Sequence, residues 1–151
     1  RVAEIARAFG AKVIYYSASG APAQEGYEQV DFETLLTQSD IISVHAPLNE
    51  HTEGLINSKA FEKMKSSCIF LNLGRGPIVD EQALYNALVR NQIAAAGLDV
   101  LCKEPMSADN PLLKIKDSKR LLITPHIAWA SVEARTHLME IIHKQVKDFF
   151  A

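Results

Sequence analysis

Three polar residues in this sequence follow apolar runs, and together their side chains could hold and protonate a small acid. Arg75 lies in a Gly-Arg-Gly turn just after the run Cys68-Ile69-Phe70-Leu71, and His126 follows the run 121–124 and Pro125. Glu104 lies a few residues beyond a third run, which ends at Asp99. A guanidinium is a planar fork that suits a carboxylate. A histidine paired with a carboxylate is suited to donating a proton, because the carboxylate orients the ring and stabilises its protonated form.

Each of these residues also has an explanation without chemistry. Arg75 could be an exposed turn arginine that only contacts water, and Glu104, which precedes Pro105, could be a charge in a solvated loop. His126 could be a histidine at a strand end whose hydrogen bonds are already satisfied. The hypothesis of a site therefore rests on three coincident positions and on no single residue.

The elements expected to position these residues are short strands that alternate with amphipathic helices. Apolar, β-branched runs predict the strands, and Asp, Asn, Ser and Gly at the boundaries predict the helix ends. This alternation predicts the α/β class with a doubly wound parallel sheet of the Rossmann type, in which ligands lie beyond the carboxyl ends of the strands. The expected strands are 12–16, 40–44, 68–71, 93–100 and 121–124; the expected helices are 2–9, a short one beginning at Asp31, 57–64, 80–90 and 131–151, with a helical turn at 112–113.

Two of the expected helices carry a marked apolar face. The helix capped by Asp80 should turn Leu84, Leu88 and Val89 inward. The C-terminal helix, 131–151, has an apolar stripe that would pack within the chain or against a further domain; the stripe consists of Leu138, Ile141, Ile142, Val146 and Phe149.

Composition restricts the class of protein. The 151 residues are 48% hydrophobic and 23% charged, as in an ordinary globular domain, and the net charge of -2 argues against a nucleic-acid or anionic-membrane surface. No apolar run approaches the about 18 residues that a membrane span needs. Cys68 and Cys102 lie far apart in the sequence, which predicts free thiols in a reducing compartment such as the cytoplasm, with no metal site.

Several motifs follow one another in this sequence at characteristic separations. They are Asn72-Leu73-Gly74-Arg75-Gly76 with Val79-Asp80, Gly97-Leu98-Asp99-Val100 with Glu104-Pro105, Thr124-Pro125-His126-Ile127, and His45-Ala46-Pro47-Leu48 with Thr52 and Gly54-Leu55-Ile56. Together they resemble one enzyme family over essentially the whole chain, the D-isomer-specific 2-hydroxyacid dehydrogenases. The stretch Ile127-Ala128-Trp129-Ala130 looks more like the glycerate dehydrogenase and hydroxypyruvate reductase branch than like phosphoglycerate dehydrogenase.

The resemblance implies reversible hydride transfer between a nicotinamide cofactor and a small 2-oxo acid, in a homodimer. Arg75 would bind the substrate carboxylate and polarise the keto oxygen, His126 would protonate that oxygen, and Glu104 would keep the imidazole protonated. Asp99 would contact the nicotinamide end of the cofactor. The residues expected to line the cofactor site are Ser17, His45, Ala46, Pro47, Thr52, Leu73, Gly74, Arg75, Asp99, His126 and Ala128.

The sequence departs from the family pattern in two ways. The Gly-rich phosphate loop and the first strand, which would immediately precede Arg1, and the substrate domain are not in residues 1–151. We therefore expect a fragment that binds cofactor poorly by itself. Ser17 also stands where an acidic residue usually selects NAD, yet no Arg or Lys follows in 18–23, so NAD is favoured and NADP stays open. An alternative function is that of a non-catalytic, dinucleotide-sensing protein, like the corepressors that resemble this family.

Overall fold

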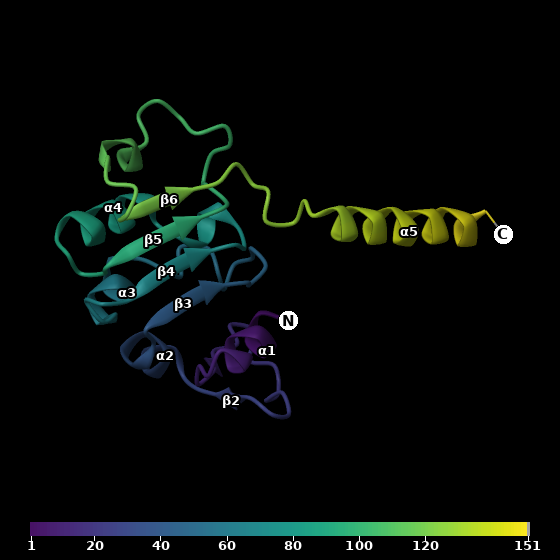
Figure 1. Cartoon of the computed structure of the whole chain (residues 1–151), viewed down its shortest axis with the longest axis horizontal. Coiled ribbons are helices and arrows are strands. Elements are labelled where there is room, and N and C mark those ends of the chain that lie inside the picture. Colours follow the sequence, from purple (N-terminus) through teal and green to yellow (C-terminus); the bar gives the residue numbers. More distant parts are fainter. Residues whose placement is uncertain (151) are drawn as a thin grey trace.

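All strand pairs among the described residues are parallel, as the alternation of strands and helices predicts. The computed structural model describes residues 1–150. In chain order the elements are α1 (Val2–Ala8), β1 (Ile14–Tyr15), β2 (Glu28–Gln29), α2 (Phe32–Gln38), β3 (Ile41–Val44), α3 (Ser58–Lys63), β4 (Ile69–Asn72), the 3-10 turn η1 (Gly76–Ile78), α4 (Glu81–Val89), β5 (Ala95–Leu98), the 3-10 turn η2 (Pro111–Lys114), β6 (Leu121–Ile123) and α5 (Val132–Phe149). Figure 1 shows their arrangement.

Four of the strands form one parallel sheet in the order β3-β4-β5-β6. Successive strands along the chain are neighbours in this sheet, so their carboxyl ends meet at one edge. The expected α/β class with a parallel sheet is confirmed. The strands β1 and β2 form a separate parallel pair, of which β2 lies in a stretch where the sequence analysis expects no strand.

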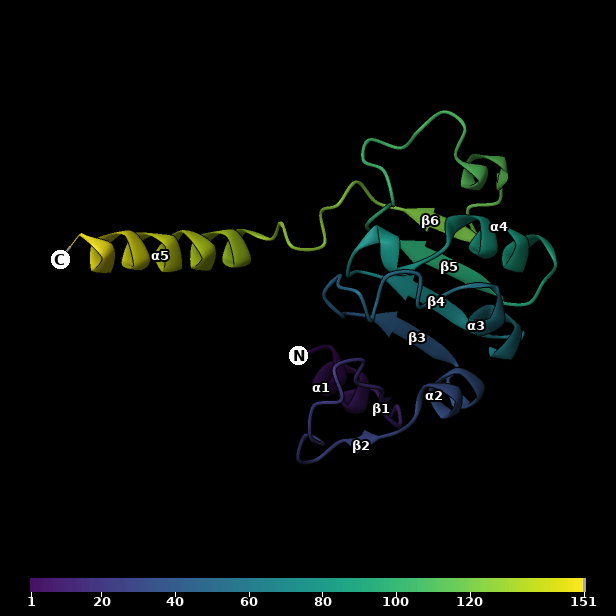
Figure 2. The ribbon, with the colours of Figure 1, turned by 180° about the vertical axis from the view of Figure 1, so that it is seen from behind.

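The core lies on one face of the four-stranded sheet. Alternate strand residues such as Ile42, Phe70 and Leu98 are at most 4% exposed, and the rings of Phe70 and of Phe61 in α3 pack edge to face with their centroids 5.5 Å apart. The helices of this layer contact one another in series, α2 with α3, α3 with α4, and α4 with η2 (Figures 1 and 2). The opposite face is open among the described residues, because its apolar side chains, Ile41, Ile69 and Leu122, are 40–61% exposed.

Side-chain caps place the helix starts where the sequence predicts them. The carboxylates of Asp31 and Asp80, the amide oxygen of Asn57 and the hydroxyl of Ser131 each accept a backbone N–H from the first turn of α2, α4, α3 and α5, respectively.

The inward face of α4 is narrower than predicted. Leu84 and Leu88 are buried, but Val89 is 55% exposed, so its predicted inward position is wrong. Val89 is the last residue of α4, and the chain turns away at the following C-cap, Arg90. Ala83 and Ala87 take the buried positions beside the two leucines instead.

Helix α5 extends away from the sheet, as both ribbon views show (Figures 1 and 2). Its apolar stripe is exposed over the described part of the chain, with Leu138, Ile141 and Ile142 each 41–46% accessible. No helix among residues 1–150 is both long enough and apolar enough to cross a membrane.

The contrast between Leu88 and Val89 gives a test of the core. Leu88→Ala should lower the free energy of unfolding of the full-length protein by about 2–5 kcal/mol, because it removes a fully packed side chain. Val89→Ala, one residue along the same helix, is the matched control and should change it by about 0.5 kcal/mol or less. Urea unfolding measures both values; equal losses would contradict the described orientation of α4.

Candidate active site

The turn that carries Arg75 is built by the buried side chain of Asn72, the last residue of β4. Its amide oxygen accepts the Gly74 N–H at 3.1 Å, and its amide nitrogen donates to the Arg75 carbonyl at 3.0 Å. Gly74 packs so closely that an added Cβ would lie 3.0 Å from the Ala46 carbonyl oxygen in the loop after β3. The guanidinium of Arg75 is anchored by one bond, from Nη1 to the Gly74 carbonyl at 2.8 Å, and is otherwise exposed.

The predicted histidine and carboxylate pair is present. His126 Nδ1 lies 2.8 Å from Glu104 Oε2, and the other carboxylate oxygen accepts the Leu101 N–H at 2.9 Å. The Leu101 N–H and the neighbouring imidazole hold the pKa of Glu104 below its usual range. Because an ionised carboxylate only accepts hydrogen bonds, Nδ1 must carry the proton of this bond, which leaves Nε2 as the working nitrogen.

Asp99 lies beneath the loop that carries His126. This carboxylate is 3% exposed and accepts the Thr124 hydroxyl at 2.5 Å and the N–H groups of Ile127 and Ala128 at 2.9 Å each. Burial acts to raise the pKa of Asp99, but the bonds from Thr124, Ala128 and Ile127 and the charge of His126 outweigh it and lower the pKa. Asp99 thus anchors the loop, a role the sequence analysis does not anticipate.

These residues meet at one cleft beyond the carboxyl ends of β4, β5 and β6. Its volume is about 400 Å³, and its lining consists of Leu73, Arg75, Asp99, His126, Ala128, Trp129 and Leu138. Glu104 stands behind the imidazole rather than in the lining. A second hollow, of about 570 Å³, runs along α5 from Val132 to His143, but residues of a single helix line it, so it is an open helix face.

The structure places the other predicted cofactor residues around this edge with unequal access. Leu73 and Gly74 follow β4, and His45, Ala46 and Pro47 follow β3, where His45 Nε2 bonds the Ser43 hydroxyl at 2.8 Å. Thr52 differs from the other residues of the predicted lining in that its side chain lies inside the loop. It is 1% exposed and its hydroxyl donates to the Pro47 carbonyl at 2.6 Å, so its side chain shapes the loop from inside and offers no surface to a ligand.

Ser17 lies apart from the cleft residues. It follows β1 in the separate two-stranded unit, where its hydroxyl lies 3.2 Å from that of Ser19. The structure therefore brings together the predicted site residues that follow β3, β4, β5 and β6, whereas Ser17 lies beside the other, two-stranded sheet.

Two residues without a predicted role in the site, Glu81 and Gly76, fix the position of Glu104. Glu81, at the start of α4, accepts the Cys102 N–H and the Asn110 side-chain amide at 2.7 Å each. Gly76 packs against the same loop, because a Cβ added there would lie 2.0 Å from the Leu101 carbonyl. The second glycine of the Gly-Arg-Gly turn was the signal for this close approach. Burial and the charge of Glu81 also raise the pKa of the Cys102 thiol to about 11, so it stays protonated near neutral pH.

Comparison with known proteins gives a consistent family match. Residues 1–128 match the family model described as the D-isomer specific 2-hydroxyacid dehydrogenase, NAD binding domain. The chain is 45% identical over 148 residues to a hydroxypyruvate reductase of Blautia hydrogenotrophica. The matched residues make up 97% of this chain and 45% of that protein. The chain thus spans about half the length of the curated relatives that it matches.

Solved structures agree with this match. An acyclic imino acid reductase (Bsp5) in complex with NADPH and D-Arg has a TM-score of 0.88 at 39% identity, covering 99% of this chain and 46% of that one. The D-lactate dehydrogenase from Aquifex aeolicus complexed with NAD and lactic acid has a TM-score of 0.88 at 31% identity, covering 99% of this chain and 49% of that one.

The lowered pKa of Asp99 yields a prediction for stability. A carboxyl whose pKa falls on folding stabilises the folded protein above its unfolded pKa, about 3.9 for Asp, and loses that contribution as the pH falls through the folded value. Asp99→Asn should therefore lower the free energy of unfolding at pH 7 by about 1–3 kcal/mol, since it replaces a buried acceptor of three hydrogen bonds. The difference from wild type should shrink toward pH 3.

Denaturant unfolding of the full-length protein at several pH values measures this difference. Glu25→Gln, which removes a charge from an exposed loop, is the control and should show no such pH-dependent loss. A deficit for Asp99→Asn that is constant from pH 7 to pH 3 would contradict the assignment.

Proposed function

This chain belongs to the D-isomer specific 2-hydroxyacid dehydrogenases, and we propose that the full-length protein transfers a hydride between NAD(H) and a small D-2-hydroxy acid or 2-oxo acid. The observation that carries this proposal is the 2.8 Å pair of His126 and Glu104, set behind a cleft that Arg75 also lines. A cation for a carboxylate and a proton donor beside it are what reduction of a 2-oxo acid requires.

In the proposed reaction the side chains of this chain bind and protonate the substrate. Arg75 holds the carboxylate and polarises the keto oxygen, and His126 gives the proton on Nε2 to that oxygen as hydride reaches the carbon. Glu104 holds Nδ1–H, which fixes the ring orientation and stabilises the imidazolium. In the reverse direction the same imidazole takes the hydroxyl proton.

The residues around the cleft fit the nicotinamide end of a dinucleotide. A Cβ added at Gly74 would lie 3.0 Å from the Ala46 carbonyl oxygen, so the loops after β3 and β4 pack directly against each other, and the exposed Leu73 gives an apolar surface beside them. We propose that Leu73, Gly74, His45, Ala46, Pro47, Asp99 and Ala128 hold this end, while Thr52 keeps the His45–Pro47 loop in shape. The cofactor, when bound, supplies or accepts the hydride.

We propose NAD as the preferred cofactor, on three supports. The matched family model is an NAD binding domain. Ser17 at the end of β1 is followed by no Arg or Lys in 18–23, so no cation of this segment would attract a 2′-phosphate. The solved D-lactate dehydrogenase is complexed with NAD, whereas the solved imino acid reductase is complexed with NADPH, so NADP is the cofactor against which to compare.

We propose hydroxypyruvate or glyoxylate as the first substrates to assay, with glycerate in the reverse direction. The 45% identity to a hydroxypyruvate reductase and the stretch Ile127-Ala128-Trp129-Ala130 both support this choice.

We further propose that residues 1–151 form part of a nucleotide-binding domain. In the complete domain, a further strand would lie in space between β1 and β3 and would join the two sheets into one. The separation of β1-β2 from β3-β4-β5-β6 supports this, as does the half-length coverage of the relatives. Residues 1–151 by themselves should then bind cofactor poorly, so turnover and cofactor binding are to be measured on the full-length protein.

Two further proposals concern the cell and the assembly. The free thiols of Cys68 and Cys102 favour a reducing compartment, the cytoplasm. The exposed apolar stripe of α5 and the open face of the sheet leave surface that a homodimer or a further domain would cover.

Substitution of His126 tests the proposed reaction. The full-length protein should oxidise NADH in the presence of hydroxypyruvate or glyoxylate, faster than NADPH, and His126→Ala should lower kcat by about 10² to 10⁴ with NADH binding retained. His137→Ala is the matched control, because His137 also faces a carboxylate, Glu140 at 3.6 Å, but lies on α5 outside the cleft lining. Binding of NADH without turnover of any 2-oxo acid would instead support the dinucleotide-sensing alternative.

Gly76 tests whether the Glu104 loop positions the imidazole. Gly76→Ala places a Cβ 2.0 Å from the Leu101 carbonyl, so the loop must move. A shift of about 1 Å at a catalytic group costs about 10²-fold, and we expect that loss in kcat/KM. Gly97→Ala is the control, since its Cβ meets only the flexible end of the Leu71 side chain at 2.9 Å. Wild-type kcat/KM in Gly76→Ala would contradict the role of this loop.

A further inference from the structure

His126 has a backbone conformation that a histidine does not hold without help. Its φ is +55°, in the left-handed region of backbone conformation that residues other than glycine rarely adopt. Residues kept in this region persist only where the surroundings fix them, and they gather at functional sites. The contacts around His126 must therefore hold its backbone in this conformation.

Backbone contacts fix the two sides of His126. Its own N–H donates to the Thr124 carbonyl at 3.0 Å, across Pro125. The next two N–H groups, of Ile127 and Ala128, donate to the Asp99 carboxylate. These bonds leave the His126 carbonyl, whose partner among the described residues is the side chain of Trp129.

The indole of Trp129 donates from Nε1 to the His126 carbonyl oxygen at 3.0 Å. That carbonyl and the Ile127 N–H belong to the same peptide group and point in opposite directions from it. Trp129 therefore holds one side of this peptide plane and Asp99 holds the other, at 3.0 and 2.9 Å. Bonds on both sides resist rotation of this plane, and together with the bond from the His126 N–H to the Thr124 carbonyl they fix the Cα–Cβ direction of His126.

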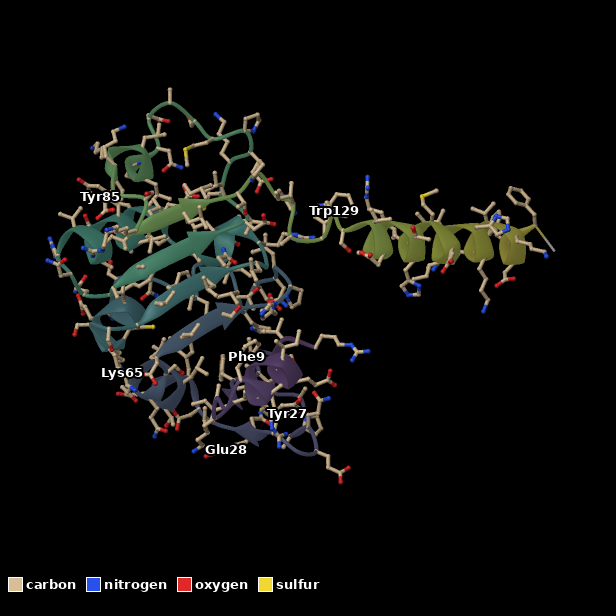
Figure 3. The ribbon with its side chains drawn as sticks, in the orientation of Figure 1. Phe9, Tyr27, Glu28, Lys65, Tyr85 and Trp129 are labelled. Atoms are coloured by element: carbon tan, nitrogen blue, oxygen red, sulfur yellow. The ribbon has the colours of Figure 1, made fainter. Side chains whose placement is uncertain are left out.

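The exposure of Trp129 argues that its N–H matters more than its packing. The side chain is 53% exposed and lines the cleft, at the point where the chain leaves the sheet toward α5 (Figure 3). An indole in this position is not a core residue whose loss would leave a large cavity. Its polar end is nevertheless fully used.

We propose that Trp129 is a positioning residue for His126. Its indole N–H, acting opposite Asp99, keeps the peptide plane after His126 in place, so that Nδ1 stays on Glu104 and Nε2 faces the cleft. The role rests on the proposed function, in which His126 delivers the proton. It predicts that the indole N–H affects the rate of the proton step and has little effect on substrate or cofactor binding.

The test compares side chains that keep the ring but lose the donor. In the full-length protein, Trp129→Phe, and benzothienylalanine at position 129, in which sulfur replaces the N–H with little change of shape, should each lower kcat about tenfold. KM for the 2-oxo acid and Kd for NADH should stay within about twofold, and the solvent deuterium isotope effect on kcat should rise, because proton transfer becomes more rate-limiting. A merely structural loss would not raise that isotope effect.

A second measurement is independent of activity. Hydrogen exchange of the segment 121–130 should be faster in Trp129→Phe than in wild type, because one side of the peptide plane is released. Tyr27→Phe is the control, since it removes a hydroxyl from a ring in the separate β1-β2 unit, far from Trp129 in Figure 3, and should change neither kinetics nor exchange.

Wild-type kcat in both variants at position 129, or unchanged exchange of 121–130 in Trp129→Phe, would overturn the proposal. If the unaltered protein reduces no 2-oxo acid, the proposed function fails, and the exchange experiment still decides whether Trp129 holds the peptide plane.

Discussion

A single buried carboxylate determines where the imidazole of this site lies. Asp99 directly follows β5 and accepts hydrogen bonds from one hydroxyl and two N–H groups of the segment that follows the neighbouring strand β6. Two of these donors are backbone N–H groups, so the loop from Thr124 to Ala128 must curve around the Asp99 carboxylate. The left-handed backbone of His126 and its contact with Glu104 both depend on that path. Without Asp99 the Thr124 hydroxyl and the N–H groups of Ile127 and Ala128 would lose the acceptor that holds them.

The order of the sheet turns distant stretches of sequence into one cleft. Arg75 follows β4, Asp99 and Glu104 follow β5, and His126 follows β6, and these three strands are adjacent and parallel. Their carboxyl ends therefore share an edge. Close packing adds the second constraint, since Gly76 lets the Arg75 turn lie directly against the Leu101 backbone, and Glu81 holds the following residues. The Arg75 turn and the loop that carries Glu104, the partner of His126, are thus in direct backbone contact, in addition to the cleft that Arg75 and His126 share.

Sequence reasoning identifies the helices and every strand except β2, and it identifies most residues of the cleft, but it does not identify the contacts between loops. Periodicity and caps are local signals, and they correctly predict the parallel sheet, the helix starts at Asp31, Asn57, Asp80 and Ser131, and the turn at η2. The predicted inward position of Val89 is wrong because the exact end of a helix depends on its C-cap, and the spacing of apolar residues does not locate that cap. The burial of Thr52 depends on how its own loop folds back to Pro47. The role of Glu81 could not be predicted, because its partners Cys102 and Asn110 lie 21 and 29 residues away in the sequence. Asn72 and Trp129 bond residues at most three positions away, but those bonds depend on the path of an irregular loop, which spacing does not reveal.

The central claim is that Arg75, His126 and Glu104 act on one substrate in one cleft. The most direct measurement is a crystal structure of the full-length protein with NAD and oxamate, an analogue of a 2-oxo acid that is not reduced. We predict that the carboxylate of oxamate lies on the Arg75 guanidinium and that its carbonyl oxygen lies about 3 Å from His126 Nε2, with Nδ1 still bonded to Glu104. An analogue bound away from Arg75, or an imidazole whose Nε2 faces away from it, would contradict the claim.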